Sequence, residues 1–306
     1  MSAASDRAAR LAKEPLRRVD ASEGLISGAL LGWRAIFEHH ELLGEMVKRE
    51  IKARYKDSGL GVLWSFIRPL AQLLVYYLVM GKFLGAQRSI PMYAVFVFTG
   101  ITLWSMFSEV ITTATQSILA NAGIIKKVQM PREILPLSSV GAALFNFLVQ
   151  VALLIVAALI LGHMPFGKSL LYAPAAALVA VTWATALALI LSAANVYLRD
   201  VRYLIEVVLM VGFWFSPIVY QWAMVNRIVS HFLMEIYLCN PMTVCILAFQ
   251  RAIWGTPTMP NGTPANELYP AHLGPRLMVM WAIGLLLLLV AQRIFYRLQR
   301  NFAQEI

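Results

Sequence analysis

The sequence predicts an all-α integral membrane protein with six transmembrane helices, and three observations support this fold class. The 306-residue chain is 59% hydrophobic and only 14% charged, which excludes a soluble globular domain with an ordinary surface. Its apolar residues gather in long runs, and about 20 such residues in a helix suffice to cross a bilayer. Its basic residues flank these runs. We therefore expect a chain that crosses the membrane several times.

The first region, residues 1–58, is predicted to be a cytoplasmic segment that ends in an amphipathic interface helix. Apolar residues recur at every fourth position and form one stripe, consisting of Leu43, Val47, Ile51 and Tyr55. The remaining faces carry the basic residues Lys48, Arg49, Lys52, Arg54 and Lys56. Such a helix lies along an anionic membrane surface. The start of the chain lacks the apolar centre of a cleavable signal, so we expect it to stay in the cytoplasm.

Six apolar runs form a predicted transmembrane domain over residues 59–298, followed by a cytoplasmic tail at 299–306. The runs cover approximately residues 60–83, 92–117, 135–161, 170–196, 203–222 and 277–296. Polar residues interrupt 223–254, which predicts two re-entrant helices that meet near Asn240 and Pro241. Six spans place both termini on one side. Nineteen Lys and Arg residues on that side, against six on the other, predict that it is the cytoplasm.

One basic residue lies inside a predicted span. Arg68 stands eight residues into the first run, where an unpaired charge is costly. Glu109 lies in the second run near the same membrane boundary, so we expect the two side chains to meet. Two interpretations stay open: a structural ion pair between spans, or a cation that contacts a phosphate near a cytoplasmic entrance.

The second run has a polar face whose residues return every three or four positions, which predicts contact with protein or water. These residues are Thr102, Ser105, Ser108, Glu109, Thr112, Thr115 and Gln116. Aromatic residues in the runs are typical of packing or of an interfacial belt, although rings also bind the apolar faces of sugars. The predicted substrate path comprises Trp64, Arg68, Tyr76, Trp104, Ser105, Ser108, Glu109 and Thr112.

The sequence lacks the motifs that are typical of several other classes of function. There is no GxxxxGK[ST] phosphate loop, so we expect no cofactor in this chain. Cys239, Cys245 and the five scattered His residues complete no metal-binding spacing. The net charge of +10 sits beside apolar runs, where lipid rather than nucleic acid is the expected partner. A sugar transferase acting on a lipid carrier would need paired carboxylates, and a secondary transporter would show repeated halves; neither pattern is visible.

Five motifs occur together and in order along residues 40 to 305. They are RYKDSGLGVLWSFIRPL at 54–70, NAGIIKKVQMPREILPLSS at 121–139, YLRDVRYL at 197–204, FSPIVY at 215–220 and NPMTVCILAFQRAIWG at 240–255. The set resembles the membrane subunits of ABC exporters that move teichoic acids, O-antigens and capsule-type polysaccharides across the inner membrane. Arg68 departs from that pattern, because the family commonly has an uncharged Asn before the proline.

The resemblance implies a permease subunit of the bacterial cytoplasmic membrane, not an enzyme. It also implies a homodimer, two separate nucleotide-binding subunits that bind ATP and Mg, and a polymer on an undecaprenyl diphosphate carrier as substrate. The amphipathic helix would be the gate or interface helix, and the loop after the second run would couple to the ATPase. The coupling residues would be Asn121, Ile124, Ile125, Lys126, Lys127, Val128, Pro131, Arg132 and Glu133.

Alternatives remain for the loop and for the chain. The apolar residues Ile124, Ile125 and Val128 offer a partner a surface to bury, but a solvated loop with topogenic lysines would also contain Lys126 and Lys127. For the whole chain, an ABC exporter of a small molecule or drug is the nearest alternative. Depletion of the chain from the cell distinguishes a polysaccharide exporter from a small-molecule exporter, because a lipid-linked polymer should accumulate only in the first case.

Overall fold

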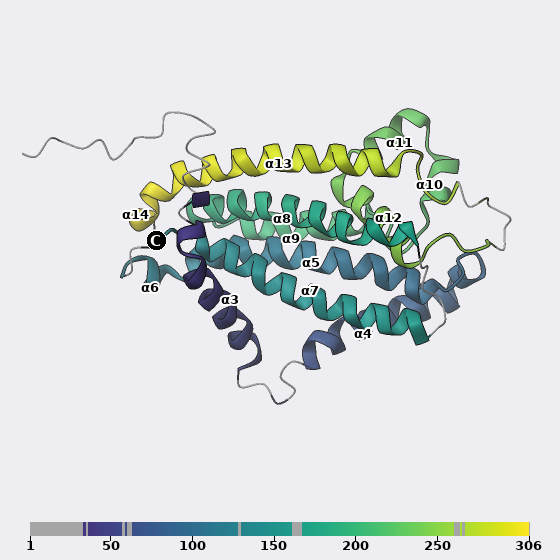
Figure 1. Ribbon diagram of the computed structural model, residues 1–306, viewed down its shortest axis with the longest axis horizontal. Helices are drawn as coiled ribbons and strands as arrows, with labels where there is room; N and C mark the ends of the chain where they lie inside the picture. The colour runs from purple at the N-terminus through teal and green to yellow at the C-terminus, as the bar shows by residue number, and fades with distance from the viewer. Residues whose placement is uncertain are drawn as a thin grey trace, which may run out of the picture.

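The computed structural model shows a bundle of long helices that lie roughly side by side (Figure 1). The structure describes residues 33–34, 36–56, 59, 63–127, 130–160, 167–259, 264 and 267–305, and this part of the chain contains no strand. The long helices are α5 (Tyr93–Ala120), α7 (Ile134–Ile160), α8 (Tyr172–Tyr197) and α13 (Leu273–Leu298). The all-α class is therefore confirmed.

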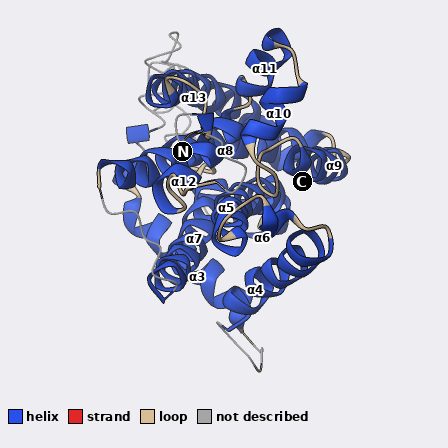
Figure 2. Cartoon of the chain, turned by 90° about the vertical axis from the view of Figure 1, so that its right-hand side faces the viewer, coloured by secondary structure: helices blue, strands red, loops and turns tan. Residues whose placement is uncertain are grey.

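The core of the bundle surrounds α5, which lies near the centre when the bundle is seen from its end (Figure 2). Most residues of α5 are buried, and α7 and α8 pack against it. On its other side α8 packs closely on α13. Trp183 Nε1 donates a hydrogen bond to the Met280 carbonyl at 2.8 Å, and a Cβ at Gly284 would lie 2.8 Å from the same nitrogen. Small residues that permit such close approach are common where helices pack together in membrane proteins.

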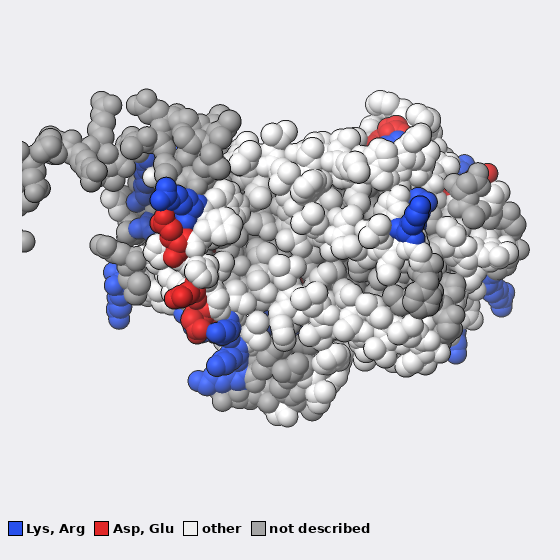
Figure 3. All heavy atoms as spheres, in the orientation of Figure 1, with Lys and Arg blue, Asp and Glu red and all other residues white. Residues whose placement is uncertain are grey.

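Four helical segments of the described chain are long and apolar enough to cross a membrane: Tyr93–Ala120, Ile134–Ile160, Lys168–Tyr197 and Leu273–Asn301. A fifth crossing is counted if α11 (His231–Leu238) and α12 (Pro241–Ile253) are taken as one bent segment. On the face drawn in Figure 3, charged side chains gather at the two ends of the bundle and leave a broad uncharged belt between them. The chain is thus a multi-pass membrane protein, and four of the six predicted runs form single long helices.

The first predicted run is not one regular α-helix. It consists of α4 (Trp64–Tyr76, 13 residues) followed by the π-helix η2 (Tyr77–Phe83, 7 residues), and 60–62 lie outside the described residues. Together these two elements extend for about 30 Å, enough for the hydrocarbon core. They lie at the rim of the bundle (Figure 2), where Pro69 and Gly81 are their only buried residues among the side chains described.

The fifth predicted run also differs from the expectation. Its helix, α9 (Val201–Trp214), ends at Trp214 rather than near residue 222. The chain turns at Ser216, which precedes Pro217, because a residue before a proline avoids the helical conformation. The carbonyl of Pro217 accepts a hydrogen bond from Gln250 Nε2 at 2.9 Å, which fixes the turn on α12. The 14 residues of α9 extend for only about 21 Å.

The region before the last span breaks where the sequence predicts it. After α10 (Trp222–Ile228), helices α11 and α12 meet at an angle of 85° on either side of Asn240. The Asn240 side chain accepts a hydrogen bond from the Met242 amide at 3.0 Å, and Pro241 occupies the first turn, so α12 has a well-formed start. A bidentate ion pair, with both N–O distances 2.8 Å, joins Glu235 of α11 to Arg276 of α13.

The two ends of the bundle carry different short elements (Figure 1). At one end, called the α6 end, lie α3 (His40–Tyr55), α6 (Ala122–Ile125) and the C-terminal α14 (Phe302–Glu305), which follows the turn η6 (Gln299–Asn301). The other end, called the α11 end, carries α10 and α11. The remaining short turns are η3 (Ala86–Arg88) and η4 (Lys168–Leu171).

Candidate functional site

A cavity of about 710 Å³ with many polar lining residues lies between α3, α4, α5 and α7. Each helix contributes side chains to its wall. The lining residues are Glu50, Ala53, Arg54, Trp64, Arg68, Pro69, Gln72, Ser105, Glu109, Thr113, Asn146 and Gln150. Four of them, Trp64, Arg68, Ser105 and Glu109, belong to the substrate path that the sequence predicts.

The wall formed by α3 is held in place by α7. A Cβ at Gly141 would lie 2.6 Å from a methyl group of Val47, so the two helices touch where α7 has no side chain. Next to this contact, the Glu50 carboxylate accepts hydrogen bonds from Ser138 Oγ at 3.0 Å and Ser139 Oγ at 2.9 Å. Val47 of the predicted apolar stripe therefore packs on α7, while Glu50 makes a contact that the sequence analysis missed.

Glu109 pairs with Arg54 of α3, not with Arg68 as the sequence predicts. An Arg54 Nη1 contacts Glu109 Oε1, and Asn146 Nδ2 donates to the same oxygen at 2.8 Å. Both charged side chains are about three-quarters buried, with exposed fractions of 26% and 21%. The expected pair is wrong because α3 folds back along α7, which brings its last turn level with the middle of α5.

Arg68 lies on the opposite wall of the cavity. Its guanidinium carbon is 5.9 Å from the centre of the Trp64 ring, a cation–π distance, and no ion pair joins it to a carboxylate of the described residues. Gln150 is only 6% exposed, and its side-chain oxygen has no hydrogen-bond partner in the described part of the chain. One guanidinium nitrogen of Arg54 also has no partner there. Cations, an amide and an indole ring around one cavity suit a ligand that is both anionic and rich in hydroxyl groups.

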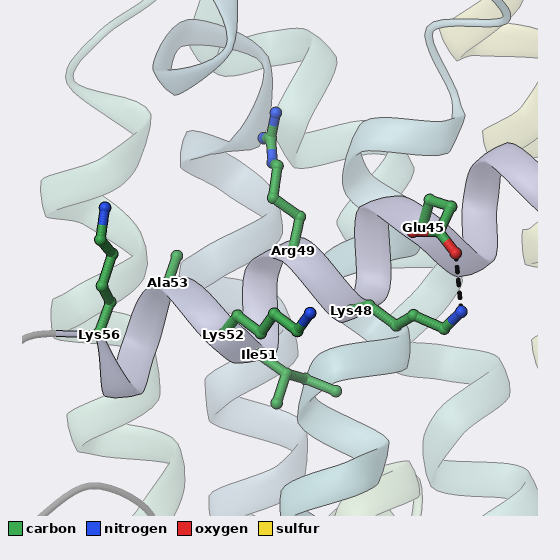
Figure 4. A pocket seen from close by; sticks show the side chains of 7 residues that line it. All are labelled: Glu45, Lys48, Arg49, Ile51, Lys52, Ala53 and Lys56. Atoms are coloured by element: carbon green, nitrogen blue, oxygen red, sulfur yellow. Dashed lines mark hydrogen bonds and ion pairs between the residues drawn. The ribbon is translucent and has the colours of Figure 1, made fainter.

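The predicted gate helix, α3, divides its basic residues between two faces. Figure 4 shows Lys48 paired with Glu45 at 2.7 Å on the outward face, where a shallow concavity of about 860 Å³ also contains Lys52 and Lys56. Arg49 extends away from that pair and donates to Asn121 at the start of α6. The side chain of Tyr55 lies outside the described residues. The contact to Asn121 joins the gate helix to the predicted coupling loop.

Other residues of the predicted path serve packing. Trp104 is 8% exposed and its ring packs on Phe107 and Phe213. Tyr76 stacks on Phe213 at 5.7 Å and lines a separate groove between α4 and α9. On α5, Ser108 and Thr112 donate to carbonyls of their own helix, at 3.2 and 2.8 Å. Thr102 and Thr115 of the predicted polar face are buried and its other members are partly exposed, but the hydroxyl protons of Ser108 and Thr112 bond within α5.

The predicted coupling loop contains α6 and the residues that follow it. Ile124 is partly exposed and Lys126 and Lys127 are exposed, whereas Ile125 is 9% exposed and packs inside the chain. Val128 lies outside the described residues. Further along the loop, Pro131 and Arg132 are partly exposed and Glu133 is buried. Of the pair Ile124 and Ile125, therefore, only Ile124 has a side chain that a partner subunit can contact.

Two amides of the cavity were missed although the sequence contains a signal for them. Asn146 and Gln150 stand four positions apart in the very apolar α7, and polar residues at that spacing share one helix face. In a membrane helix such a face points at protein or at a water-filled space. Glu50 carries no comparable signal, because it stands among charged neighbours in α3.

Comparisons with known proteins agree with this arrangement. The ABC-2 type transporter family matches residues 41–254. The O-antigen export system permease protein RfbA of Myxococcus xanthus is 30% identical over 273 residues, which cover 89% of this chain and 98% of RfbA. RfbA of Klebsiella pneumoniae is 30% identical over 264 residues, with coverages of 86% and 94%. The capsule polysaccharide export inner-membrane protein CtrC of Neisseria meningitidis serogroup B is 33% identical over 94 residues, with coverages of 30% and 35%. The chain belongs to the ABC-2 type transporter family.

Proposed function

We propose that this chain is the transmembrane subunit of an ATP-driven exporter that moves an undecaprenyl-diphosphate-linked surface glycopolymer across the bacterial cytoplasmic membrane. The observation that carries the proposal is the cavity wall, where Arg54, Arg68 and Gln150 face the same space as Trp64 in a chain of this family. Relatives named for O-antigen and capsule export support a polysaccharide as the polymer. A teichoic acid would offer the same diphosphate and hydroxyl groups.

The α6 end faces the cytoplasm in this proposal, and both termini lie there. The excess of basic residues on this side supports that orientation. The cavity between α3 and α4 then opens near the cytoplasmic face, where a lipid-linked polymer is made. The bent α11–α12 pair would form two re-entrant helices on the outer side, and α4 and α9 would complete the count of six spans.

Two partners complete the transporter. A second copy of the chain covers the apolar side chains that α4 and α9 expose, which include Leu74, Val75, Val207 and Val208. Two nucleotide-binding subunits bind ATP and Mg and dock on α6, where Ile124, Lys126 and Lys127 are accessible. The diphosphate enters beside Arg68, because a guanidinium without a carboxylate partner retains its full capacity to bind phosphate oxygens.

The proposal is tested in the producing bacterium and with purified protein. Depletion of the chain should leave a lipid-linked polymer inside the cell, and the chain should stimulate ATP hydrolysis only together with a nucleotide-binding subunit. Arg68→Gln and Gln150→Leu should each reduce export at least about tenfold while the complex still assembles. Lys52→Gln, which removes a charge from the outward face of α3, is the matched control.

Three outcomes would overturn parts of this proposal. Robust ATP hydrolysis by the pure single chain would refute the need for a partner. Depletion without any accumulated polymer, combined with retention of a small molecule, would favour the small-molecule exporter. Normal export by both cavity variants would remove the cavity from the substrate path.

A further inference from the structure

The last residues of the chain are packed against the bundle. The Phe302 side chain is completely buried, and its ring lies 5.7 Å from that of Phe295 and 6.2 Å from that of Tyr197. Tyr197 Oη in turn donates a hydrogen bond to the Leu298 carbonyl at 2.7 Å. The segment Gln299–Glu305, called the C-terminal latch below, is therefore fixed to the ends of α8 and α13.

Two consecutive residues of the coupling loop bind this latch. Arg132 donates a hydrogen bond to the Gln299 carbonyl, and its guanidinium carbon is 5.9 Å from the centre of the Phe302 ring. Glu133 is 3% exposed, and its Oε1 accepts hydrogen bonds from Gln299 Nε2 at 3.0 Å and Gln292 Nε2 at 3.5 Å. The loop thus reaches the latch through both a cation and a carboxylate.

Helix α6 shares its apolar base with the latch. Ile125 belongs to the same buried cluster as Phe295 and Phe302, and this cluster is separate from the main core around α5. A four-residue helix has almost no stability of its own, because a single turn does not repay the cost of nucleation. The orientation of α6 is therefore set by the buried cluster that Ile125 joins, and Phe302 is a member of that cluster.

We propose that the C-terminal latch is a second part of the coupling surface, which holds α6 at the angle at which the nucleotide-binding subunit engages it and passes that subunit's movement to α8 and α13. The proposal rests on the function proposed above, since it assumes an ATPase partner at α6. Arg132, Glu133, Gln299 and Phe302 act as positioning residues. The partner would meet Gln304 and Glu305 as well as Lys126 and Lys127, because these four side chains are exposed at the same end.

The first test uses the chain without its partner. In Phe302→Ala, amide hydrogen exchange at residues 121–127 should rise by at least about tenfold, because α6 loses its base, while exchange in α5 and α8 stays slow. Phe232→Ala is the matched control, since it removes the same side chain from an exposed position on α11 at the other end of the bundle. Unchanged exchange in α6 of Phe302→Ala would overturn the proposal.

The second test uses the complex with its nucleotide-binding subunit, reconstituted in lipid. Gln299→Ala, which removes the hydrogen bond to Glu133 without opening the aromatic contact, should lower the amount of polymer exported per ATP hydrolysed by several fold. Phe302→Leu, which keeps an apolar side chain of similar size, should retain most of the coupling that Phe302→Ala loses. A latch that is only structural would lower the thermal midpoint of each variant and leave the ratio of export to hydrolysis unchanged, and that result would refute the role in coupling.

The two proposals fail in different ways. If the wild-type chain neither binds nor stimulates a nucleotide-binding subunit, the proposed function is wrong and the role of the latch in coupling falls with it. If the wild-type complex works and both Gln299→Ala and Phe302→Ala export as much polymer per ATP as the wild type, only the role of the latch is wrong.

Discussion

The two flanks of the bundle are held in opposite ways. On one flank, α8 and α13 touch closely, with the Trp183 ring seated on Gly284 and hydrogen-bonded to the Met280 carbonyl. On the other flank, α4 has the polar cavity on one side and a groove of about 460 Å³ towards α9 on the other. The α8–α13 contact is therefore closed at Trp183, although a groove of about 530 Å³ lies between the first turns of these helices, whereas α4 is open on both of its sides. Movement during transport is expected on the flank that is loosely packed.

The largest expected effect comes from forcing the tight flank apart. Gly284→Ala would place a methyl group 2.8 Å from Trp183 Nε1, and the overpacking should destabilise the chain by about 1–3 kcal/mol. Gly44→Ala is the matched control, because a Cβ at Gly44 has no neighbour within 4 Å. Thermal unfolding in detergent compares the two. Equal midpoints would mean that the α8–α13 contact is not tight.

The next effect separates the two arginines of the cavity. Arg54→Met leaves the Glu109 carboxylate with the Asn146 amide alone, so it should cost about 1–3 kcal/mol. Glu109→Gln in the same chain should restore most of that loss, since it removes the unpaired charge. Arg68→Met should cost less than about 1 kcal/mol, because Arg68 is exposed and forms a cation–π contact but no ion pair within the described part of the chain. Additive losses for Arg54 and Glu109, in a thermal double-mutant cycle, would refute the pair.

A smaller effect concerns the attachment of α3 to the bundle. Glu50→Ala removes the acceptor of two serine hydroxyls and should cost about 1 kcal/mol while making α3 more accessible to protease. Glu45→Ala breaks only an exposed pair with Lys48, so protease accessibility should not change. If both variants are cleaved at the same rate, the contact between Glu50 and α7 does not hold α3.

The smallest expected effect is a pH dependence at the α6 end. Burial raises the pKa of the Glu133 carboxyl above its ordinary value, although the hydrogen bond from Gln299 and the charge of Arg132 oppose the rise. The folded chain then keeps this proton over a pH range in which the unfolded chain has released it. Stability should therefore fall as pH rises from the ordinary carboxyl pKa through the raised one.

Glu133→Gln tests this pH dependence, since the variant keeps a side-chain acceptor for Gln299 but cannot ionise. The thermal midpoint of the wild type should decline relative to that of the variant as pH increases from the ordinary carboxyl pKa to the raised pKa of Glu133. Parallel curves would show that Glu133 titrates in the folded chain as it does in the unfolded one.

The sequence predicts the helical class and the position of each long helix because both follow from runs of apolar residues. It does not predict the Arg54–Glu109 pair. The height of Arg54 beside α5 depends on where α3 rests on α7, and that is decided by Val47 on Gly141, two residues far apart in the chain. Local periodicity contains no information on such a contact.

The coupling loop shows a second limit of the sequence. Ile124 and Ile125 look equivalent as an apolar pair, yet Ile125 is buried in the cluster that also contains Phe302, and Ile124 stays partly exposed. In a helix of one turn, neighbouring residues point in different directions, so the side that becomes buried depends on what lies beneath it. Here the buried cluster beneath Ile125 includes Phe302 of the C-terminal latch.

The π-helix η2 continues α4 and carries its own contact to the bundle. In α4, Trp64, Arg68 and Gln72 stand four positions apart and all line the cavity, whereas within η2 Gly81 lies under the Tyr93 ring, where a Cβ would be 3.0 Å from a ring carbon. Each residue of an α-helix turns the chain by about 100°, so inserting or deleting one residue between Tyr77 and Met80 would rotate α4 while the contact at Gly81 stays fixed. The length of this one segment therefore decides which side chains of α4 line the cavity. A one-residue change in length would alter the cavity wall without any substitution inside the cavity.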